Sequence, residues 1–464
     1  MANQTELLLA YYGDDFTGST DALEFLSRAG IKTVLFIAPP TPAQLARYEG
    51  LQAIGVAGMS RSMPPAEMER ELIPAFKALK NLGAAHVHYK VCSTFDSSPQ
   101  IGSIGKAIDV ATDIFKAPFV PLLVAAPALG RYCTFGNLFA RMGIGSQGDI
   151  YRLDRHPSMS RHPVTPAHES DLRLHLAKQT SKSIGLVDVL TIASDKQQRQ
   201  QKLQTELDKG KQIILFDALY DDHLLTIAQL INQYATASQP LFSVGSSGIE
   251  MALGKYWTEQ GLAKPKQEWQ PSGKAYGMLV VSGSCSPVTA QQIEYAEAHG
   301  FAAIAIDTAA IAKSTLIEVE TYILQSVELM QQGIPVIVHT SLGPNDHRIE
   351  DTYQAFIKQG LNEDDIRTKT AKLYGETLGL IAIGVAKKGL LKRLVIAGGD
   401  TSSFVARAMG IEAVEMIAPV SPGAPLCKVH APNSAAHGIE INFKGGQVGS
   451  DNYFETVLNG QTTT

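Results

Sequence analysis

The chain has few residues of the kinds that mark disulfide-bonded or metal-bound proteins. Its 464 residues include four cysteines, which form neither a CxxC pair nor a zinc-ligand spacing, and this argues against a disulfide framework. Twelve histidines contain no HExxH pattern. His156 and His162 do lie near each other in DRHPSMSRHP, where we expect a solvated loop, with a metal site as the alternative.

Basic charge and long apolar runs are also lacking. The 40 Lys and Arg residues are dispersed and are outnumbered by 45 Asp and Glu, for a net charge of -5, so a nucleic-acid partner is not expected. No apolar stretch reaches the ~18 residues that a membrane span needs. The first residues, MANQTELLLA, have no basic region ahead of their short apolar run. We therefore expect a soluble, cytoplasmic protein without a membrane partner.

Short apolar runs alternate with longer segments of helical period, which predicts mostly parallel sheets covered by helices. In the first half the expected strands are LLLAYY, KTVLFIA, QAIGVAG, HVHYKV, PLLVAAPA, IGLVDVL, QIILFDA and PLFSVGSSG. Helices are expected over residues 19–28, 65–80 and 101–115, the first two closed by glycines.

A compositional break in LAKPKQEWQPSGKAY separates this half from the next, and its Pro, Lys, Gln and Gly residues are typical of a linker. Strands restart at YGMLVVSGS, FAAIAID, IPVIVHT and RLVIAGGD, with helices expected over 291–299, 363–389 and 403–410. From about Pro419 we expect an irregular, glycine-rich tail. The fold prediction is two α/β domains, 1–262 and 277–464, joined by a linker at 263–276, with a ligand cleft between them.

Residues that directly follow strands are where open α/β sheets bind ligands. The first such loop, GDDFTGST, contains two adjacent carboxylates, Asp14 and Asp15. Neighbouring carboxylates repel each other, so this pair suits a cation, a donor-rich ligand or solvent. The alternative is ordinary helix capping, with Ser19 or Thr20 as the N-cap.

The other loops of the first half add cations and hydroxyls, and the whole set suits a small, polyhydroxylated, anionic ligand. Arg61 and Lys90 would bind a carboxylate, and Asp14 or Asp15 would bind hydroxyls or act as a general base. The loop residues concerned are Asp14, Asp15, Thr17, Ser60, Arg61, Ser62, Lys90, Ser93, Thr94 and Asp96.

In the second half, two strands run into loops that resemble anion sites at helix starts. One contains Gly283, Ser284 and Ser286 ahead of Pro287, and the other is Gly398 to Thr401 in AGGDTSS. Together they suggest a polyphosphate ligand, although neither matches the Walker pattern or GxGxxG, and plain turns and caps are the alternative.

Two later segments extend this prediction. Lys444 precedes Gly445 and Gly446, which suits a phosphate, or else a turn with a solvated lysine. SPGAPLCKVHAPN, over 421–433, is expected to form a rigid loop able to wall an adenine pocket.

Taken in order, these pieces resemble the four-carbon acid sugar kinase family over nearly the whole chain. The pieces that carry the resemblance are GDDFTGSTDA, SRS, KVCSTFDSS, VGSSG, SGSCSPVTAQQI, GGDTSS, PGAPLC and KGGQVGSDNYF. The resemblance implies an ATP-dependent kinase that phosphorylates a small sugar acid, with Mg²⁺, a substrate-binding N-terminal domain and a nucleotide-binding C-terminal domain. Whether the protein forms a homo-oligomer is left open by the sequence.

The resemblance also implies residue roles. On the substrate side it points to Asp15, Arg61, Lys90, Ser93 and Thr94, with Asp15 as the candidate base, and the loop residues Asp14, Thr17 and Asp96 are further substrate-binding candidates. On the nucleotide side it points to Ser284, Ser286, Gly398, Gly399, Asp400, Thr401, Lys444, Gly445, Gly446 and Gln447. Asp400 could contact the metal directly or through water, or could cap its helix.

One segment departs from the family pattern Lys-Ile-Asp-Ser-Thr-Leu-Arg-Gly-Asn. Cys92 replaces the acid, and Asp96 stands where an arginine is common. An anion in place of a cation beside an acidic ligand implies a changed substrate, so a branched oxo-acid such as 3-oxo-isoapionate competes with 3-oxo-tetronates. GRYCTFGNLFAR matches the family only loosely, and Arg131 is a further pocket candidate. A non-catalytic sugar-acid binding protein and, with less support, a dehydrogenase are the rival functions.

Overall fold

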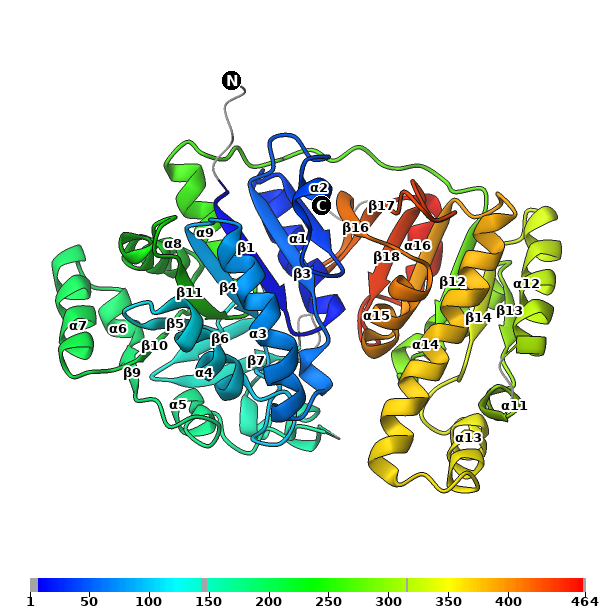
Figure 1. Cartoon of the computed structure of the whole chain (residues 1–464), viewed down its shortest axis with the longest axis horizontal. Helices are drawn as coiled ribbons and strands as arrows, with labels where there is room; N and C mark the ends of the chain where they lie inside the picture. The colour runs from blue at the N-terminus through cyan, green and yellow to red at the C-terminus, as the bar shows by residue number, and fades with distance from the viewer. Residues whose placement is uncertain (1–6, 143–147, 163, 314–315, 462–464) are drawn as a thin grey trace. The chain divides into compact units, whose positions relative to one another are not determined.

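The computed structural model describes residues 7–142, 148–162, 164–313 and 316–461. The chain divides into two compact units, unit 1 (Met1–Gln267) and unit 2 (Glu268–Thr464), and the division falls within the 263–276 segment. In Figure 1, unit 1 runs from blue to green and unit 2 continues from green to red. Each unit combines a mostly parallel sheet with flanking helices, which confirms the predicted α/β class.

The sheet of unit 1 is built from parallel strands in the order β2-β3-β1-β4-β11-β5-β10-β9. The strands are β1 (Leu9–Gly13), β2 (Thr33–Phe36), β3 (Ala53–Ala57), β4 (His86–Lys90), β5 (Val120–Leu123), β9 (Ile184–Val187), β10 (Ile213–Phe216) and β11 (Leu241–Gly245). Strands β1 and β3 are buried throughout, which is why they read as continuous apolar runs without alternation.

Helices of unit 1 follow these strands. They are α1 (Phe16–Arg28), α2 (Pro42–Leu45), α3 (Pro65–Asn81), α4 (Ile104–Phe115), α5 (Leu172–Leu176), α6 (Val189–Ile192), α7 (Lys196–Asp208), α8 (Asp221–Ile231) and α9 (Gly248–Glu259). The predicted cap of the first helix was wrong: α1 begins at Phe16, because Asp15 accepts a hydrogen bond from the Gly18 amide. Likewise α4 begins at Ile104, capped by Ser103, and not at residue 101.

A small antiparallel sheet in unit 1 was not predicted. It comprises β6 (Arg131–Thr134), β7 (Asn137–Arg141) and β8 (Ile150–Arg152). Phe135 and Gly136 join β6 to β7 and both have positive φ, at 50° and 82°, as in a two-residue type I′ hairpin. The expected strand PLLVAAPA therefore ends at Leu123, and the chain after it turns into this hairpin.

The sheet of unit 2 has the order β13-β14-β12-β15-β18-β17-β16. Its strands are β12 (Met278–Ser282), β13 (Ala302–Ala305), β14 (Val336–His339), β15 (Arg393–Ala397), β16 (Ala413–Ser421), β17 (Ala424–His430) and β18 (Glu440–Lys444). Strands β12 to β15 and β18 pair in parallel, whereas β17 runs antiparallel to both β16 and β18.

The C-terminal part of unit 2 corrects two predictions. Instead of an irregular tail from Pro419, the chain forms a β16–β17 hairpin, then β18 and α16 (Tyr453–Asn459). The hairpin turns at Pro422-Gly423, where Gly423 has φ of 80°, so most of the segment expected to wall an adenine pocket is strand. Prolines and glycines that suggested a loop lie at this turn and at irregular positions of the β16 ladder.

Helices cover the sheet of unit 2. They are α10 (Pro287–Ala298), α11 (Thr308–Lys313), α12 (Leu316–Gln331), α13 (His347–Ile357), α14 (Glu363–Lys387), α15 (Gly399–Ala408) and α16. The long helix expected over 363–389 is confirmed as α14, whereas α10 and α15 begin four residues earlier than predicted. Among the residues that the structure describes, every helix is too short or too polar for a membrane span.

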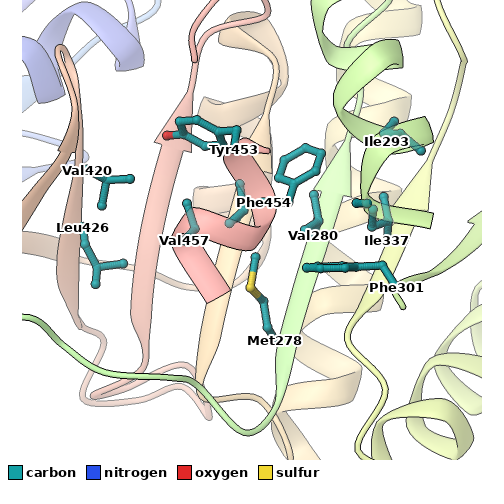
Figure 2. Packing of buried hydrophobic residues seen from close by; sticks show 12 residues of the cluster. Met278, Val280, Ile293, Phe301, Ile337, Val420, Leu426, Tyr453, Phe454 and Val457 are labelled. Carbon is teal, nitrogen blue, oxygen red and sulfur yellow. The ribbon is translucent and has the colours of Figure 1, made fainter. Parts of the chain in front are cut away.

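The core of unit 2 lies between its central strands and the helices α10 and α16 (Figure 2). Met278 and Val280 of β12 and Ile337 of β14 are fully buried, and Phe454 and Val457 of α16 pack in the same cluster. Burying each such side chain contributes about 1.5–3 kcal/mol. This packing joins β12, β14 and β15 to the helices α10 and α16.

Candidate active site

Loops at the carboxyl ends of neighbouring strands gather the polar residues of unit 1. Strands β3, β1, β4 and β11 are adjacent and parallel, so their ends share one edge of the sheet. Backbone hydrogen bonds join the loops there, from Asp14 N to Lys90 O at 2.9 Å and from Arg61 N to Asp14 O at 3.0 Å. Residues that are distant in the sequence therefore meet at this edge.

Arg61 binds both carboxylates of the aspartate pair. Its Nε and Nη2 atoms donate to Asp14 Oδ2 and Oδ1 at 3.0 and 2.7 Å, and its Nη1 donates to Asp15 Oδ2 at 2.6 Å. The guanidinium offsets the repulsion between the adjacent acids. The Asp15 side chain is 13% exposed and that of Asp14 only 3%, so Asp15 is the carboxylate that a ligand reaches more easily.

The pKa values of Asp14 and Arg61 in this cluster are shifted by different balances of burial and charge. Burial raises the pKa of Asp14 to about 6, even though Arg61 lowers it. Burial lowers the pKa of Arg61, but Asp14 and Asp15 together raise it well above its ordinary value. Arg61 therefore stays cationic, whereas Asp14 titrates just below neutral pH.

Asp15 also caps helix α1. Its Oδ1 accepts from Gly18 N at 2.7 Å, and its Oδ2 accepts from Thr17 Oγ1 at 2.8 Å. The capping alternative thus applies to Asp15 itself, and Thr17 serves to hold that carboxylate. Capping and ligand binding are compatible here, because a carboxylate offers about four lone-pair sites.

Gly18 lies where two cations and one carboxylate converge. A Cβ atom built on Gly18 would lie 2.6 Å from Asp15 Oδ1, 3.4 Å from Lys90 Nζ and 3.5 Å from Arg61 Nη2. The Gly18 amide is paired with the same Asp15 oxygen. Glycine at this position therefore lets the first turn of α1 approach the Lys90 and Arg61 cations closely.

Lys90 is buried and held by residues that sequence reasoning missed. Its Nζ lies 3.3 Å from Asp21 Oδ2, and Ser247 Oγ donates to the same oxygen at 2.5 Å. Burial lowers the pKa of Lys90, but neighbouring carboxylates, first that of Asp21, raise it above its ordinary value. The available signals were the place of Asp21 one turn beyond Gly18 on α1 and the polar VGSSG loop after a buried strand.

Glu250 and His88 lie deeper and were also missed. Both side chains are fully buried, with Glu250 Oε1 3.6 Å from His88 Nε2. Burial raises the pKa of Glu250 to about 8 and lowers that of His88 to about 3, so both are predominantly neutral at pH 7. Within the described part of the chain, neither oxygen of Glu250 has a hydrogen-bond partner.

This buried acid predicts a pH-dependent stability. Because the pKa of Glu250 is raised on folding, its contribution is present at low pH and is lost as the pH rises towards and through 8. We expect Glu250→Gln, which mimics the neutral acid, to remove a stability loss of about 2 kcal/mol between pH 6 and 8. Urea unfolding at both pH values measures it, with Glu259→Gln on the exposed face of α9 as control; equal pH dependence in both variants would contradict it.

The loop after β4 brings Ser93, Thr94 and Asp96 to the same edge. Ser93 and Thr94 are buried, and Cys92 Sγ lies 2.9 Å from Thr94 Oγ1. Burial, and then the Asp96 carboxylate, raises the pKa of Cys92 to about 11, so Cys92 is a neutral thiol. Asp96 Oδ1 is buried without a hydrogen-bond partner among the described residues.

Three residues considered from the sequence are engaged in local structure. Ser60 Oγ lies 2.9 Å from Tyr89 Oη, and Ser62 Oγ donates to a backbone carbonyl of its own turn. Arg131 Nη1 donates to the carbonyls of residues 129 and 141, which closes the β6–β7 hairpin. Ser60 and Ser62 thus have structural contacts, whereas Arg131 Nε is buried without a hydrogen-bond partner among the described residues.

His156 and His162 also have local partners. His156 Nδ1 accepts from the amides of Ser158 and Met159, and His162 Nδ1 accepts from that of Thr165 at 3.0 Å. Across the described residues, no three His, Cys, Asp or Glu side chains form a group that could hold a metal ion. The segment forms short 3-10 turns and His156 is buried, so the expected solvated loop is wrong for His156.

In unit 2, three glycine- and serine-rich loops meet at the carboxyl ends of β12, β15 and β18, which are neighbours in the sheet. Gly283 N donates to Ala397 O and Gly398 N to Lys444 O, at 3.0 and 2.9 Å. A Cβ on Gly446 would lie 2.9 Å from Ser284 Oγ, and one on Gly283 would lie 2.2 Å from Thr401 Oγ1. These glycines let the three loops approach one another closely.

Each loop enters a helix from this shared edge. Ser286 Oγ caps α10 by accepting from Val288 N, and Ser286 N donates to Ser284 Oγ at 3.2 Å. Gly398 has φ of 126° and precedes α15, whose first residues are Gly399, Asp400 and Thr401. Gly398 is thus conformationally required at that turn. The side chain of Asp400 lies outside the described part, while Gln447 is exposed in the loop after β18.

Lys444 is buried beneath these loops. Its Nζ donates to Thr289 Oγ1 and to Gly445 O, each at 3.1 Å, and lies 5.6 Å from the ring centre of Tyr453. Burial lowers the pKa of Lys444 to about 7. The solvated-lysine alternative is therefore wrong, and this amine is poised to gain a proton beside an anion.

Comparisons with known proteins agree with this division of the chain. A family model for sugar-binding N-terminal domains matches residues 9–253, and one for nucleotide-binding C-terminal domains matches residues 279–454. The 3-oxo-isoapionate kinase of Paraburkholderia graminis is 40% identical over 98% of this chain and 95% of its own length. The 3-oxo-tetronate kinase of Salmonella typhimurium is 28% identical over 97% of this chain and 98% of its own length.

A solved structure also shares the fold. A protein from Salmonella typhimurium LT2, provisionally described as a tRNA synthase, superposes with a TM-score of 0.75 at 24% identity, covering 97% of this chain and 98% of that one. At this identity the likeness shows the fold alone. The family models and curated relatives carry more: this chain belongs to the four-carbon acid sugar kinase family. It is a phosphotransferase that acts on a sugar acid, and the binding-protein alternative is not favoured.

Proposed function

We propose that this kinase transfers the terminal phosphoryl group of ATP to a hydroxyl of a branched oxo-acid of the 3-oxo-isoapionate type. The observation that carries this choice is the 40% identity to a 3-oxo-isoapionate kinase over nearly the whole of both chains, against 28% to a 3-oxo-tetronate kinase. A linear 3-oxo-tetronate is the second candidate, because several relatives with that name also match over almost their full length.

The acid would bind at the strand edge of unit 1. Its carboxylate would lie near Gly18, between Arg61 and Lys90, whose positive groups converge there. Asp14, Asp15 and Thr17 on one side, and Ser93, Thr94 and Asp96 on the other, would bind hydroxyl and oxo groups. Asp15, the more exposed carboxylate of its pair, would orient and accept the proton of the attacking hydroxyl.

ATP would bind at the three loops of unit 2. Amides and hydroxyls at the starts of two helices suit phosphate oxygens, and glycines allow close approach of the backbone. The residues assigned to this role are Ser284, Ser286, Gly398, Gly399, Thr401, Lys444, Gly445, Gly446 and Gln447.

Mg²⁺ would bridge the nucleotide phosphates. The hydroxyl, amide and amine donors described at these loops fit an anion better than a bare cation, so the metal would be held largely by the nucleotide. Mg²⁺ bound in this way needs only one or two protein carboxylates, and Asp400 at the start of α15 is our candidate. When bound, the ion would neutralise charge that develops on the transferred group.

Nucleotide binding should be coupled to protonation of Lys444. Because burial lowers its pKa to about 7, most of this amine is neutral at pH 8, and nearby phosphates would restore its charge. We expect ATP binding at pH 8 to take up about one proton. Calorimetry in buffers of different ionisation enthalpy measures the uptake; it should vanish in Lys444→Met and persist in the exposed control Lys428→Met. Equal uptake in both variants would contradict the assignment.

The substrate proposal is tested by ATP consumption, with Mg²⁺, on a panel of linear four-carbon aldonic acids, their oxo forms and 3-oxo-isoapionate. Mass detection of a phosphorylated product identifies the acceptor. We expect the highest kcat/KM for the branched oxo-acid. A higher value for 3-oxo-tetronate would select the second candidate, and nucleotide binding without turnover of any acid would contradict both.

A further inference from the structure

A small pocket in unit 1 lies between the loop after β4 and the segment that leads into α5. It is lined by Thr94, Phe95, Asp96, Ser97, Leu153, Thr165, Ala167, Glu169, Leu172 and His175. The cavity volume that the centre of a water molecule can occupy is about 10 Å³. A volume of this size holds about one water molecule or one hydroxyl group, and it is too small for a whole sugar.

The polar atoms on one wall of the pocket satisfy each other. Ser97 Oγ donates to Phe95 O at 3.0 Å and accepts from Gln179 Nε2 at 2.9 Å. His175 Nε2 lies 3.0 Å from the same hydroxyl and must donate to it, because the only hydrogen of Ser97 Oγ is already used. This wall is therefore fixed and has no free acceptor at Ser97.

The remaining polar side chains have partners as well. Thr165 Oγ1 lies 3.0 Å from His162 Nδ1, and Glu169 Oε1 accepts from Asp171 N at 2.9 Å. Thr94 Oγ1 lies 2.9 Å from Cys92 Sγ. Each of these side chains thus has an internal contact that accounts for its position.

Asp96 is different. Its Oδ1 is buried and has no hydrogen-bond partner among the described residues, although the residue lines the pocket. A buried carboxylate oxygen without a donor is unfavourable, and native proteins rarely leave one unless a ligand or water supplies the hydrogen bond. The pocket is the place from which such a donor can come.

The backbone holds Asp96 in this position at a conformational cost. Phe95, directly before it, has φ of 58°, in the left-handed region that a bulky side chain rarely adopts. The Phe95 ring is buried, with its centre 5.7 Å from that of His175, and this packing maintains the turn. Such strained residues cluster at ligand sites, because the surrounding structure must impose the geometry.

The pocket and the proposed acid site share one loop, because Thr94 and Asp96 follow closely after Lys90 at the end of β4. Thr94 lines the pocket and contacts Cys92. Cys92, which Thr94 contacts, lies between Lys90 and Asp96 along this loop. A sugar acid with its carboxylate near Arg61 and Lys90 could therefore extend one hydroxylated branch towards Asp96.

We propose that this pocket is a subsite for one hydroxyl group of the sugar acid and that Asp96 selects acids that carry a hydroxymethyl branch. The branch hydroxyl donates a hydrogen bond to Asp96 Oδ1. This inference rests on the proposed sugar-acid substrate and adds the residue that recognises its branch. A linear four-carbon acid has no branch hydroxyl to place here, so water would have to supply the donor to the carboxylate oxygen.

The test compares kcat/KM for 3-oxo-isoapionate and 3-oxo-tetronate in the wild type, Asp96→Asn and Asp96→Ala. We expect both variants to lower the value for the branched acid about 10- to 100-fold, the range for a hydrogen bond to a charged group, and to change that for the linear acid less than about threefold. Asp113→Asn, an 87% exposed aspartate on α4, is the matched control and should change neither. Equal changes for the two acids would overturn the subsite while leaving the proposed substrate intact.

A second outcome distinguishes failure of the proposed substrate from failure of the subsite. If the wild type prefers a linear acid, the proposed substrate is wrong, and that acid is then compared with analogues that each lack one hydroxyl. The subsite stands if the effect of Asp96→Asn disappears for one analogue only. It is overturned if every analogue shows the same effect. Thermal unfolding of both Asp96 variants establishes that they are folded.

Discussion

Replacing Asp15 by asparagine should lower turnover about 10²- to 10⁴-fold, the range associated with loss of a general base. Asparagine is also a favourable N-cap and can still accept from Gly18 N, but its NH₂ group cannot accept from Arg61 and Thr17 as Asp15 Oδ2 does, so thermal unfolding must establish that the variant is folded. The amide keeps the shape of the side chain but cannot take a proton from the attacking hydroxyl. kcat at saturating ATP and acid measures the effect.

Asp195→Asn is the matched control for this variant. Asp195 caps α7 in the same unit through Gln198 N at 2.9 Å, and it lies on an exposed helix start. We expect its substitution to leave kcat unchanged. If Asp15→Asn retains full turnover, the base is another group, and Asp14, with a pKa of about 6, becomes the next candidate.

Removal of the Arg61 side chain should both destabilise unit 1 and abolish measurable activity. Arg61→Ala leaves two adjacent, largely buried carboxylates without their common cation, and such a change typically lowers the free energy of unfolding by about 3–5 kcal/mol. Arg61→Lys keeps the charge but cannot bind Asp14 through two parallel N–H groups, so an intermediate loss is expected.

The loss of stability in Arg61→Ala should also depend on pH. Protonation of Asp14 relieves the uncompensated charge in Arg61→Ala, so the deficit should be smaller at pH 5 than at pH 8. Urea unfolding at the two pH values measures it. Lys372→Ala is the control, because its ion pair with Glu376 lies within α14 and its two side chains are 60% and 49% exposed, and it should cost less than about 1 kcal/mol. Similar deficits in both variants would contradict the role of Arg61.

Much of the fold was accessible from the sequence because buried parallel strands are short continuous apolar runs. The apolar runs around Leu9–Gly13 and Met278–Ser282 predicted the first and last residues of these two strands to within two positions. Prediction failed in the last part of unit 2, where prolines and glycines near the β16–β17 turn suggested irregular structure. Strand pairing with β18 overrides that local tendency.

For the aspartate pair, the local sequence predicted some features of the site, and only the tertiary structure determined the others. Two acids at a strand end predicted a cation, a donor-rich ligand or solvent beside them. Arg61 was predicted to bind a ligand carboxylate, and in the structure it binds both acids. The capping residue was misplaced because serine, threonine and aspartate are all good N-caps, and only the backbone geometry selects Asp15. Asp21 and Glu250 were missed because a carboxylate within a helix usually faces solvent.

By itself, the sequence determined the α/β class, the family and the loops that contain the candidate site residues, because these depend on local patterns and ordered motifs. Tertiary structure decided which of those residues meet. Arg61 reaches Asp14 and Asp15 across 46–47 residues because β1 and β3 are adjacent and parallel. It also decided that Glu250 is neutral, that Lys444 titrates near neutral pH and that Asp96 faces a pocket, since burial and missing partners arise only when distant segments pack together.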